Sequence, residues 1–140
     1  MTEADAAAHE RGLLDTSVVI DLGIPEVASQ LTEECAISVV TVAELAAGPH
    51  TAKDPMERAI RQQRLQWAEA TFDAISLDAP AARWYGVLVA AVLESGRQQR
   101  RRMADLLIAA TAAAQDLPLY TRNPDDSLAP RFASSRSSVW

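Results

Sequence analysis

Cysteine is almost absent from the 140-residue sequence. Cys35 is the only one, so no disulfide can form within the chain, and nothing in the cysteine content indicates an oxidising compartment. One cysteine and two histidines, His9 and His50, are too few for a zinc site of the Cys/His type. Aromatic residues make up only 5% of the chain, so its core must be built mainly from Ala, Leu, Val and Ile.

Long apolar segments are missing as well. The apolar run at residues 86–93 is far shorter than the roughly 18–20 residues that a membrane-spanning helix needs. The beginning of the chain, MTEADAAAHER, is polar and acidic, without the basic-then-apolar order of a secretory signal. We therefore expect a soluble, cytoplasmic protein.

Positive charge is scarce too. The formal net charge is −6 and Lys53 is the only lysine, which argues against a protein that holds nucleic acid by bulk electrostatics. It does not argue against an enzyme whose excess carboxylates are neutralised by a metal ion. A P-loop, a serine-hydrolase elbow, a phosphoaspartyl phosphatase and a receiver domain are all excluded, because their glycine-rich motifs, paired acids or late lysine are absent.

What the sequence does contain is an alternation of strand-like and helix-like segments. Strands are predicted at residues 12–14, 36–40, 72–77 and 117–121, and helices at 18–22, 25–34, 41–47, 54–71, 80–94 and 104–115. This alternation predicts an α/β sandwich with a mostly parallel central sheet. We expect residues 1–11 to be a mobile tail and residues 12–140 to form one domain.

Four carboxylates stand where these segments meet. Asp15 and Asp126 each follow a predicted strand, and Glu44 and Asp105 lie near the starts of predicted helices. Taken singly, each has a structural explanation. Asp15 suits a helix cap, Thr41 and Glu44 fit a T-x-x-E capping box, Asp105 suits a first turn, and Asp126 suits a turn.

Taken together, the four carboxylates predict a metal site. The carboxyl ends of parallel strands and the helix starts that follow them gather at one edge of a sheet. Two carboxylates about 5 Å apart repel by about 3 kcal/mol at an effective dielectric constant of about 20. A divalent cation would relieve that repulsion, and hard oxygen ligands suit Mg²⁺ or Mn²⁺.

Four segments in this order resemble the PIN domain, and more narrowly the ribonuclease toxins of VapBC-type toxin–antitoxin operons. They are LLDTSVVID (13–21), SVVTVAEL (38–45), ADLLIAATA (104–112) and LYTRN (119–123). The resemblance covers roughly residues 12–128. It implies a PIN-like α/β/α sandwich and a metal site on Asp15, Glu44, Asp105 and a fourth residue.

The fourth position departs from the family pattern. A Thr-x-Asn or Thr-x-Asp element is often followed three residues later by Asp-Phe, and this chain has Ser127 where Phe is usual. Asp126 is the principal candidate, with Asp125 and Asn123 as alternatives. The resemblance further implies that the hydroxyls of Thr16 or Ser17 and of Thr41, with Asn123, orient the carboxylates or a metal-bound water.

The implied activity is that of a toxin endoribonuclease. PIN toxins cut RNA at single-stranded sites, often in tRNA or rRNA, they dimerise, and an antitoxin that covers the active site silences them. The alternatives are a catalytically silent PIN-like module that binds RNA or protein, and a DNA-directed metal nuclease. The intact set of Asp15, Glu44 and Asp105 argues against the silent module.

Two further features have both a functional and a structural interpretation. Arg100, Arg101 and Arg102, with Arg122, could guide RNA phosphates to the acids, or could be solvated loop residues. An apolar stripe could dock a helix of the antitoxin, or could simply pack inside the domain; its members are Leu45, Met56, Ile60, Leu65 and Trp67.

Overall fold

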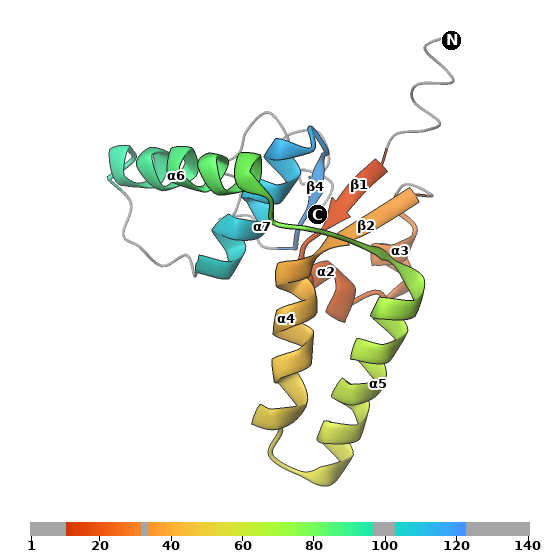
Figure 1. Cartoon of the computed structure of the whole chain (residues 1–140). Coiled ribbons are helices and arrows are strands. Elements are labelled where there is room, and N and C mark those ends of the chain that lie inside the picture. Colours follow the sequence, from red (N-terminus) through yellow and green to blue (C-terminus); the bar gives the residue numbers. More distant parts are fainter. Residues whose placement is uncertain (1–10, 32–33, 97–102, 123–140) are drawn as a thin grey trace, which may run out of the picture.

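A computed structural model of the chain describes residues 11–31, 34–96 and 103–122. Figure 1 shows the strands β1, β2 and β4 side by side, with helices around them. The strands are β1 (Arg11–Leu14), β2 (Glu34–Ser38), β3 (Asp73–Ile75) and β4 (Leu119–Tyr120). The helices are α2 (Thr16–Ile20), α3 (Pro25–Ala28), α4 (Val39–Ala47), the short 3₁₀ helix η1 (Gly48–Thr51), α5 (Pro55–Thr71), α6 (Ala79–Glu94) and α7 (Met103–Ala114).

The four described strands form one parallel sheet in the order β3-β2-β1-β4. In the register, Leu13 lies opposite both Ala36 and Leu119, and Leu14 lies opposite both Ile37 and Tyr120. The predicted fold class, an α/β arrangement around a mostly parallel sheet, is therefore confirmed.

Successive strand residues supply two separate cores, one on each face of the sheet. Leu13, Ala36 and Leu119 belong to a cluster with the buried residues of α6 and α7. Their chain neighbours Leu14 and Ile37 belong to a second cluster, which includes residues of α2, α3 and the inner ends of α4 and α5. Because side chains alternate across a strand, a sheet covered on both faces needs apolar residues at consecutive positions, as the sequence has here.

Gly12 lies in β1, at a position where the structure leaves no room for a side chain. A Cβ atom built on Gly12 would lie 2.1 Å from Cε2 of the buried Tyr120 ring. The β1–β4 pairing therefore depends on glycine at this position for close packing.

The boundaries of several elements differ from those predicted. Strand β1 begins at Arg11, within the predicted tail, and α3 ends at Ala28, well before residue 34. Helix α4 begins at Val39, two residues before the predicted start. Its N-cap is Ser38, whose Oγ accepts a hydrogen bond of 2.9 Å from the Val40 amide, so the predicted capping box at Thr41 is wrong.

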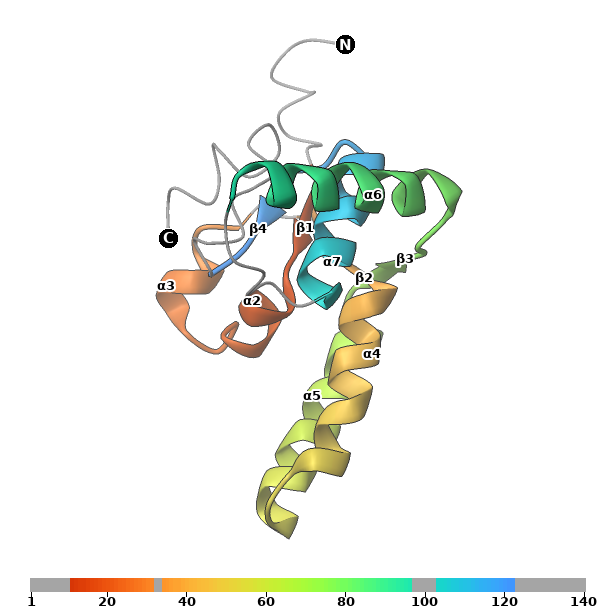
Figure 2. The ribbon, with the colours of Figure 1, turned by 90° about the vertical axis from the view of Figure 1, so that its left-hand side faces the viewer.

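Helices α4 and α5, joined by η1, form an arm that extends away from the sheet (Figures 1 and 2). Arg61 holds the far end of this arm together. Its Nη1 donates to Gly48 O at 2.9 Å and to Thr51 Oγ1 at 3.0 Å, while its Nη2 lies 3.0 Å from Glu57 Oε1. The first of these bonds pairs the carbonyl of Gly48, the C-cap of α4, where the helix itself supplies no donor. No helix in the described part of the chain is long and apolar enough to cross a membrane.

Candidate active site at the acidic edge

The first turns of α2, α4 and α7 lie at the edge where β1 and β2 end (Figures 1 and 2). The chain passes directly from β1 through Asp15 into α2, and from β2 through Ser38 into α4. Asp15, Glu44 and Asp105 all stand on elements that meet at this edge, which we call the acidic edge.

Asp15 is buried, with 5% of its surface exposed, and its Oδ2 accepts three hydrogen bonds. The donors are Ser17 Oγ at 2.6 Å, Ser17 N at 3.3 Å and Thr121 Oγ1 at 3.3 Å. Asp15 is thus the N-cap of α2, as its structural explanation predicted. The cap uses only Oδ2, so Oδ1 keeps its lone pairs available for a ligand.

Glu44 is held by a chain of two hydroxyls. Thr16 Oγ1 donates to Glu44 Oε1 at 2.6 Å, and Thr16 Oγ1 lies 2.9 Å from Thr41 Oγ1. A hydroxyl has a single proton, and that of Thr16 is used on Glu44, so Thr41 is the donor in the second bond. Thr41 is fully buried inside α4, and it reaches Thr16 because the helix starts at Val39. Each of the two carboxylates is therefore oriented by hydroxyl groups.

Asp105 lies in the first turn of α7 and is half-buried. Helix α7 packs against both α6 and α4, and α4 is the helix that carries Glu44. A carboxylate in a first turn is also stabilised by the helix macrodipole, so its structural explanation holds beside the functional one.

The described residues contain no group of three or more His, Cys, Asp or Glu side chains arranged to hold a metal ion. Asp126, Asp125 and Asn123 lie outside the described residues, as do Arg100, Arg101 and Arg102. The complete ligand set therefore stays a prediction. The donors do fit a hard divalent cation chemically, because the described acidic edge offers carboxylate and hydroxyl oxygens and neither thiolate nor imidazole.

Residues 12–130 match the sequence profile of the PIN domain. The chain belongs to the PIN domain family. It is 39% identical over 118 residues to Ribonuclease VapC5 of Mycobacterium tuberculosis, a match that covers 81% of this chain and 84% of the relative. It is 36% identical over 112 residues to Ribonuclease VapC8 of the same species, covering 80% of this chain and 96% of the relative.

Solved structures show the same PIN fold. The crystal structure of VapBC-5, a member of the VapBC family of toxin–antitoxin systems from Mycobacterium tuberculosis, superposes with a TM-score of 0.74 at 35% identity. That alignment covers 91% of this chain and 94% of the other. The structure of FitAcB from Neisseria gonorrhoeae gives a TM-score of 0.67 at 27% identity, covering 81% of this chain and 88% of the other chain.

Sequence reasoning missed two residues of this PIN domain's site. Thr121, which is buried, donates to Asp15, and Asp21 forms an ion pair with Arg122, whose Nε lies 3.2 Å from Asp21 Oδ2. The Arg122 backbone N–H also donates to Ser17 Oγ at 3.2 Å. Arg122, predicted to contact RNA, is thus engaged by a carboxylate of its own chain. The LYTRN segment contains Thr121 and the LLDTSVVID segment contains Asp21, but neither segment shows which residue each of them contacts.

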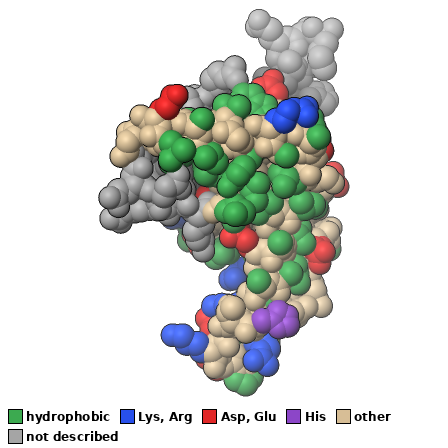
Figure 3. Space-filling model, turned by 60° about the vertical axis from the view of Figure 1, so that its left-hand side comes forward, with side chains coloured by type: hydrophobic (Ala, Val, Ile, Leu, Met, Phe, Trp, Pro, Cys, Tyr) green, Lys and Arg blue, Asp and Glu red, His purple; other side chains and the backbone are tan. Residues whose placement is uncertain are grey.

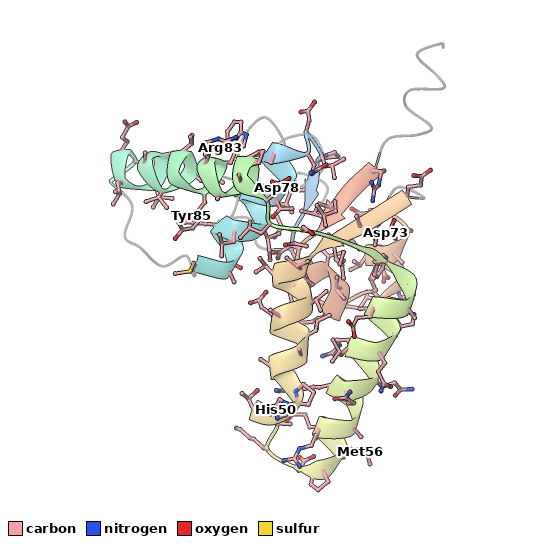
Figure 4. All side chains as sticks on the ribbon, viewed as in Figure 1. His50, Met56, Asp73, Asp78, Arg83 and Tyr85 are labelled. Atoms are coloured by element: carbon pink, nitrogen blue, oxygen red, sulfur yellow. The ribbon has the colours of Figure 1, made fainter. Side chains whose placement is uncertain are left out.

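The predicted apolar stripe separates into two groups. Leu45 is buried and Leu65 packs against the same core cluster, so the structural interpretation is correct for these two residues. Met56, Ile60 and Trp67 on α5 remain exposed, with 72%, 49% and 43% of their surfaces open. Figure 4 marks Met56 and His50 at the far end of the arm, away from the sheet.

Proposed function

We propose that this PIN domain is a VapC-type toxin, an endoribonuclease that hydrolyses RNA phosphodiester bonds with Mg²⁺ or Mn²⁺. The single observation that carries the proposal is the arrangement of Asp15 and Glu44 at one edge, each oriented by hydroxyl groups. The named relatives support it, since VapC5 and VapC8 are both ribonucleases. Asp15, Glu44 and Asp105 would hold the metal, with Asp126 as the principal fourth ligand.

The chain's own residues prepare the carboxylates rather than transfer protons. Ser17 and Thr121 fix one oxygen of Asp15, and Thr16 fixes one oxygen of Glu44, so that one oxygen of each remains for the cation. A bound divalent ion would supply an activated water and would stabilise the charge that develops on the phosphate.

We also propose that the protein acts in the cytoplasm and is restrained by a cognate antitoxin. Chains similar to this one are found in toxin–antitoxin structures, which supports that partnership. A helix of the antitoxin would bury Met56, Ile60 and Trp67, the part of the predicted stripe that stays exposed. Co-expression with the small open reading frame beside the gene should then give a tight complex without nuclease activity.

Homodimerisation is part of the same proposal. Figure 3 shows apolar side chains gathered on one face of the molecule. Those exposed on α4, α6 and α7 include Val39, Val87, Leu93 and Met103. Light scattering on the purified chain should give twice the monomer mass, and a monomer would contradict this part of the proposal.

Expression in a bacterial host without the antitoxin tests the ribonuclease function. We expect growth to stop and RNA fragments to accumulate, and Asp15→Ala should abolish both effects. Asp73→Ala is the matched control, because Asp73 is an exposed carboxylate on β3 (Figure 4) and forms only a 3.8 Å surface pair with Arg11.

Growth that continues with the wild-type chain would contradict the toxin assignment. Cleavage of DNA in preference to RNA would favour the DNA-directed nuclease, and RNA binding without cleavage would favour the catalytically silent module.

A further inference from the structure

A continuous groove runs between α2 and α5, from Glu44 to Trp67, and we call it the arm groove. It consists of two hollows. One, of about 570 Å³, is lined by Thr16 and Glu44, and the other, of about 410 Å³, is lined by Leu22 and Trp67. Ile20, Ile60 and Arg64 line both hollows, so Arg64 stands between the acidic edge and the aromatic end.

Arg64 differs from the other arginines near the site in having no anion beside it. Arg61 is used to hold the end of the arm, and Arg122 is paired with Asp21. Within the described ranges, the half-buried residue Arg64 has neither a hydrogen-bond acceptor nor an ion-pair partner for its guanidinium. A partly buried charge is costly unless it is paired, so Arg64 is prepared for an anion from outside the chain.

The outer part of the arm is locally basic, although the whole arm, residues 39–71, has four basic and four acidic side chains. Residues 48–68 contain four basic side chains against two acidic ones, Asp54 and Glu57, whereas the whole chain has a net charge of −6. Figure 3 shows Lys and Arg side chains gathered over the outer part of the arm. The outer part of the arm can therefore hold phosphates in a chain whose overall charge disfavours them.

Trp67 gives the far hollow an aromatic wall. Its ring meets Phe72 edge to face, with 5.4 Å between the ring centroids, and 43% of the residue remains exposed. A ring that is fixed on one side and open on the other is a platform on which a nucleobase can stack. Leu22, Ile20 and Ile60 complete the apolar lining.

We propose that the arm groove is a nucleotide subsite for single-stranded RNA. Arg64 binds the phosphate next to the one that is cut at the acidic edge, and the base of the nucleotide that carries this phosphate stacks on Trp67. Along the groove, the apolar wall at Trp67 would contact the base, Arg64 would contact the phosphate, and the acidic edge at Glu44 would face the bond that is cut. The inference rests on the proposed ribonuclease function, and it names where that ribonuclease holds its substrate.

Fluorescence anisotropy with a fluorescein-labelled 12-nucleotide RNA of randomised sequence tests the subsite. The full-length Asp105→Asn chain serves as the background, so that the probe stays intact. Arg64→Ala should weaken binding about tenfold and reduce the slope of log affinity against log salt by about 0.7. Arg64→Lys should keep the slope, and Arg83→Ala, at an exposed arginine of α6, should change neither quantity.

A variant at Trp67 gives a second test, in which the RNA affinity changes without any change of charge. Trp67→Ala should weaken binding by about tenfold with an unchanged salt slope, because stacking on an aromatic ring is worth about 1–3 kcal/mol per base. Trp67→Phe keeps an aromatic ring and should retain most of the RNA affinity. Thermal melting of both variants shows whether a loss of affinity comes from a folding defect.

Wild-type affinity and salt slope in both Arg64→Ala and Trp67→Ala would overturn the subsite while the ribonuclease function stands. Loss of the antitoxin complex in Arg64→Ala, with RNA binding unchanged, would also overturn it and make the groove a protein-docking surface. An RNA probe that stays intact when the wild-type chain is added with Mn²⁺ would instead contradict the proposed ribonuclease function. The two ideas therefore fail in different measurements.

Discussion

The hydroxyl of Thr16 donates a hydrogen bond of 2.6 Å to Oε1 of Glu44, 28 positions along the chain. This bond joins the first turn of α2 to α4 and fixes one oxygen of the carboxylate. The hydroxyl of Thr41 in turn donates a hydrogen bond to the hydroxyl of Thr16. The direction of Glu44 is therefore set by two residues that carry no charge themselves.

Thr16→Val removes this donor at nearly constant volume. We expect Mn²⁺ affinity and cleavage rate to fall by about 10–100-fold, as is typical when a residue that orients a metal ligand is lost. Isothermal titration with Mn²⁺ and a cleavage assay measure the two effects. Thr16→Ser keeps the hydroxyl and should retain most of both, and equal losses in the two variants would refute the orienting role.

Asp105→Asn should abolish cleavage and leave the fold at least as stable. Replacing one carboxylate by an amide removes a negative charge from an edge that also carries Asp15 and Glu44, and like charges repel each other. Cleavage assays and chemical denaturation measure the two effects. Asp116→Asn, at an exposed residue in the turn that follows α7, is the control and should keep full activity. If Asp105→Asn unfolds readily, Asp105 serves mainly to start the helix.

Gly12→Ala should lower the free energy of unfolding by about 1–3 kcal/mol, because the new methyl group would overlap the Tyr120 ring. Gly23→Ala is the matched control. A Cβ atom at Gly23 meets no atom within 4 Å, so this change should be neutral or stabilising by at most about 1 kcal/mol. Urea denaturation of the two variants checks the difference, and equal stabilities would mean that the Tyr120 ring shifts freely.

Arg61→Ala should destabilise the chain by about 1–2 kcal/mol, since it removes bonds to Gly48, Thr51 and Glu57 together. Arg58→Ala, one turn earlier on α5 and exposed, should change stability by no more than about 0.5 kcal/mol. Hydrogen exchange at residues 48–52 provides a local readout, and it should rise only in Arg61→Ala. Unchanged exchange in that variant would show that the arm end holds without this side chain.

The sheet and its site edge could be predicted from sequence because they follow from local patterns. Leu13 and Leu14 are apolar at consecutive positions, which indicates a strand covered on both faces. The placement of Asp15 at the end of that strand then follows from the rules for parallel sheets.

The parts that were mispredicted depend on choices that local patterns do not decide. Val39 and Val40 are β-branched and favour a strand, yet Ser38 caps a helix that includes both. Leu45 and Met56 share one apolar stripe, but only Leu45 reaches the core. The pairing of Asp21 with Arg122 joins opposite ends of the chain, so it is visible only once the fold is known.

The hydrogen bond between Thr121 and Asp15 spans 106 positions, and it has a consequence for synthesis of the protein. Strand β1 lies between β2 and β4 in the sheet, so its neighbour on one side is made last among the described strands. A nascent chain that ends before Leu119 has Asp15 but neither Thr121 nor the β4 backbone that flanks it. The ribosome therefore completes the acidic edge only after β4 has been synthesised, and a chain truncated before Leu119 would lack the proposed ribonuclease activity.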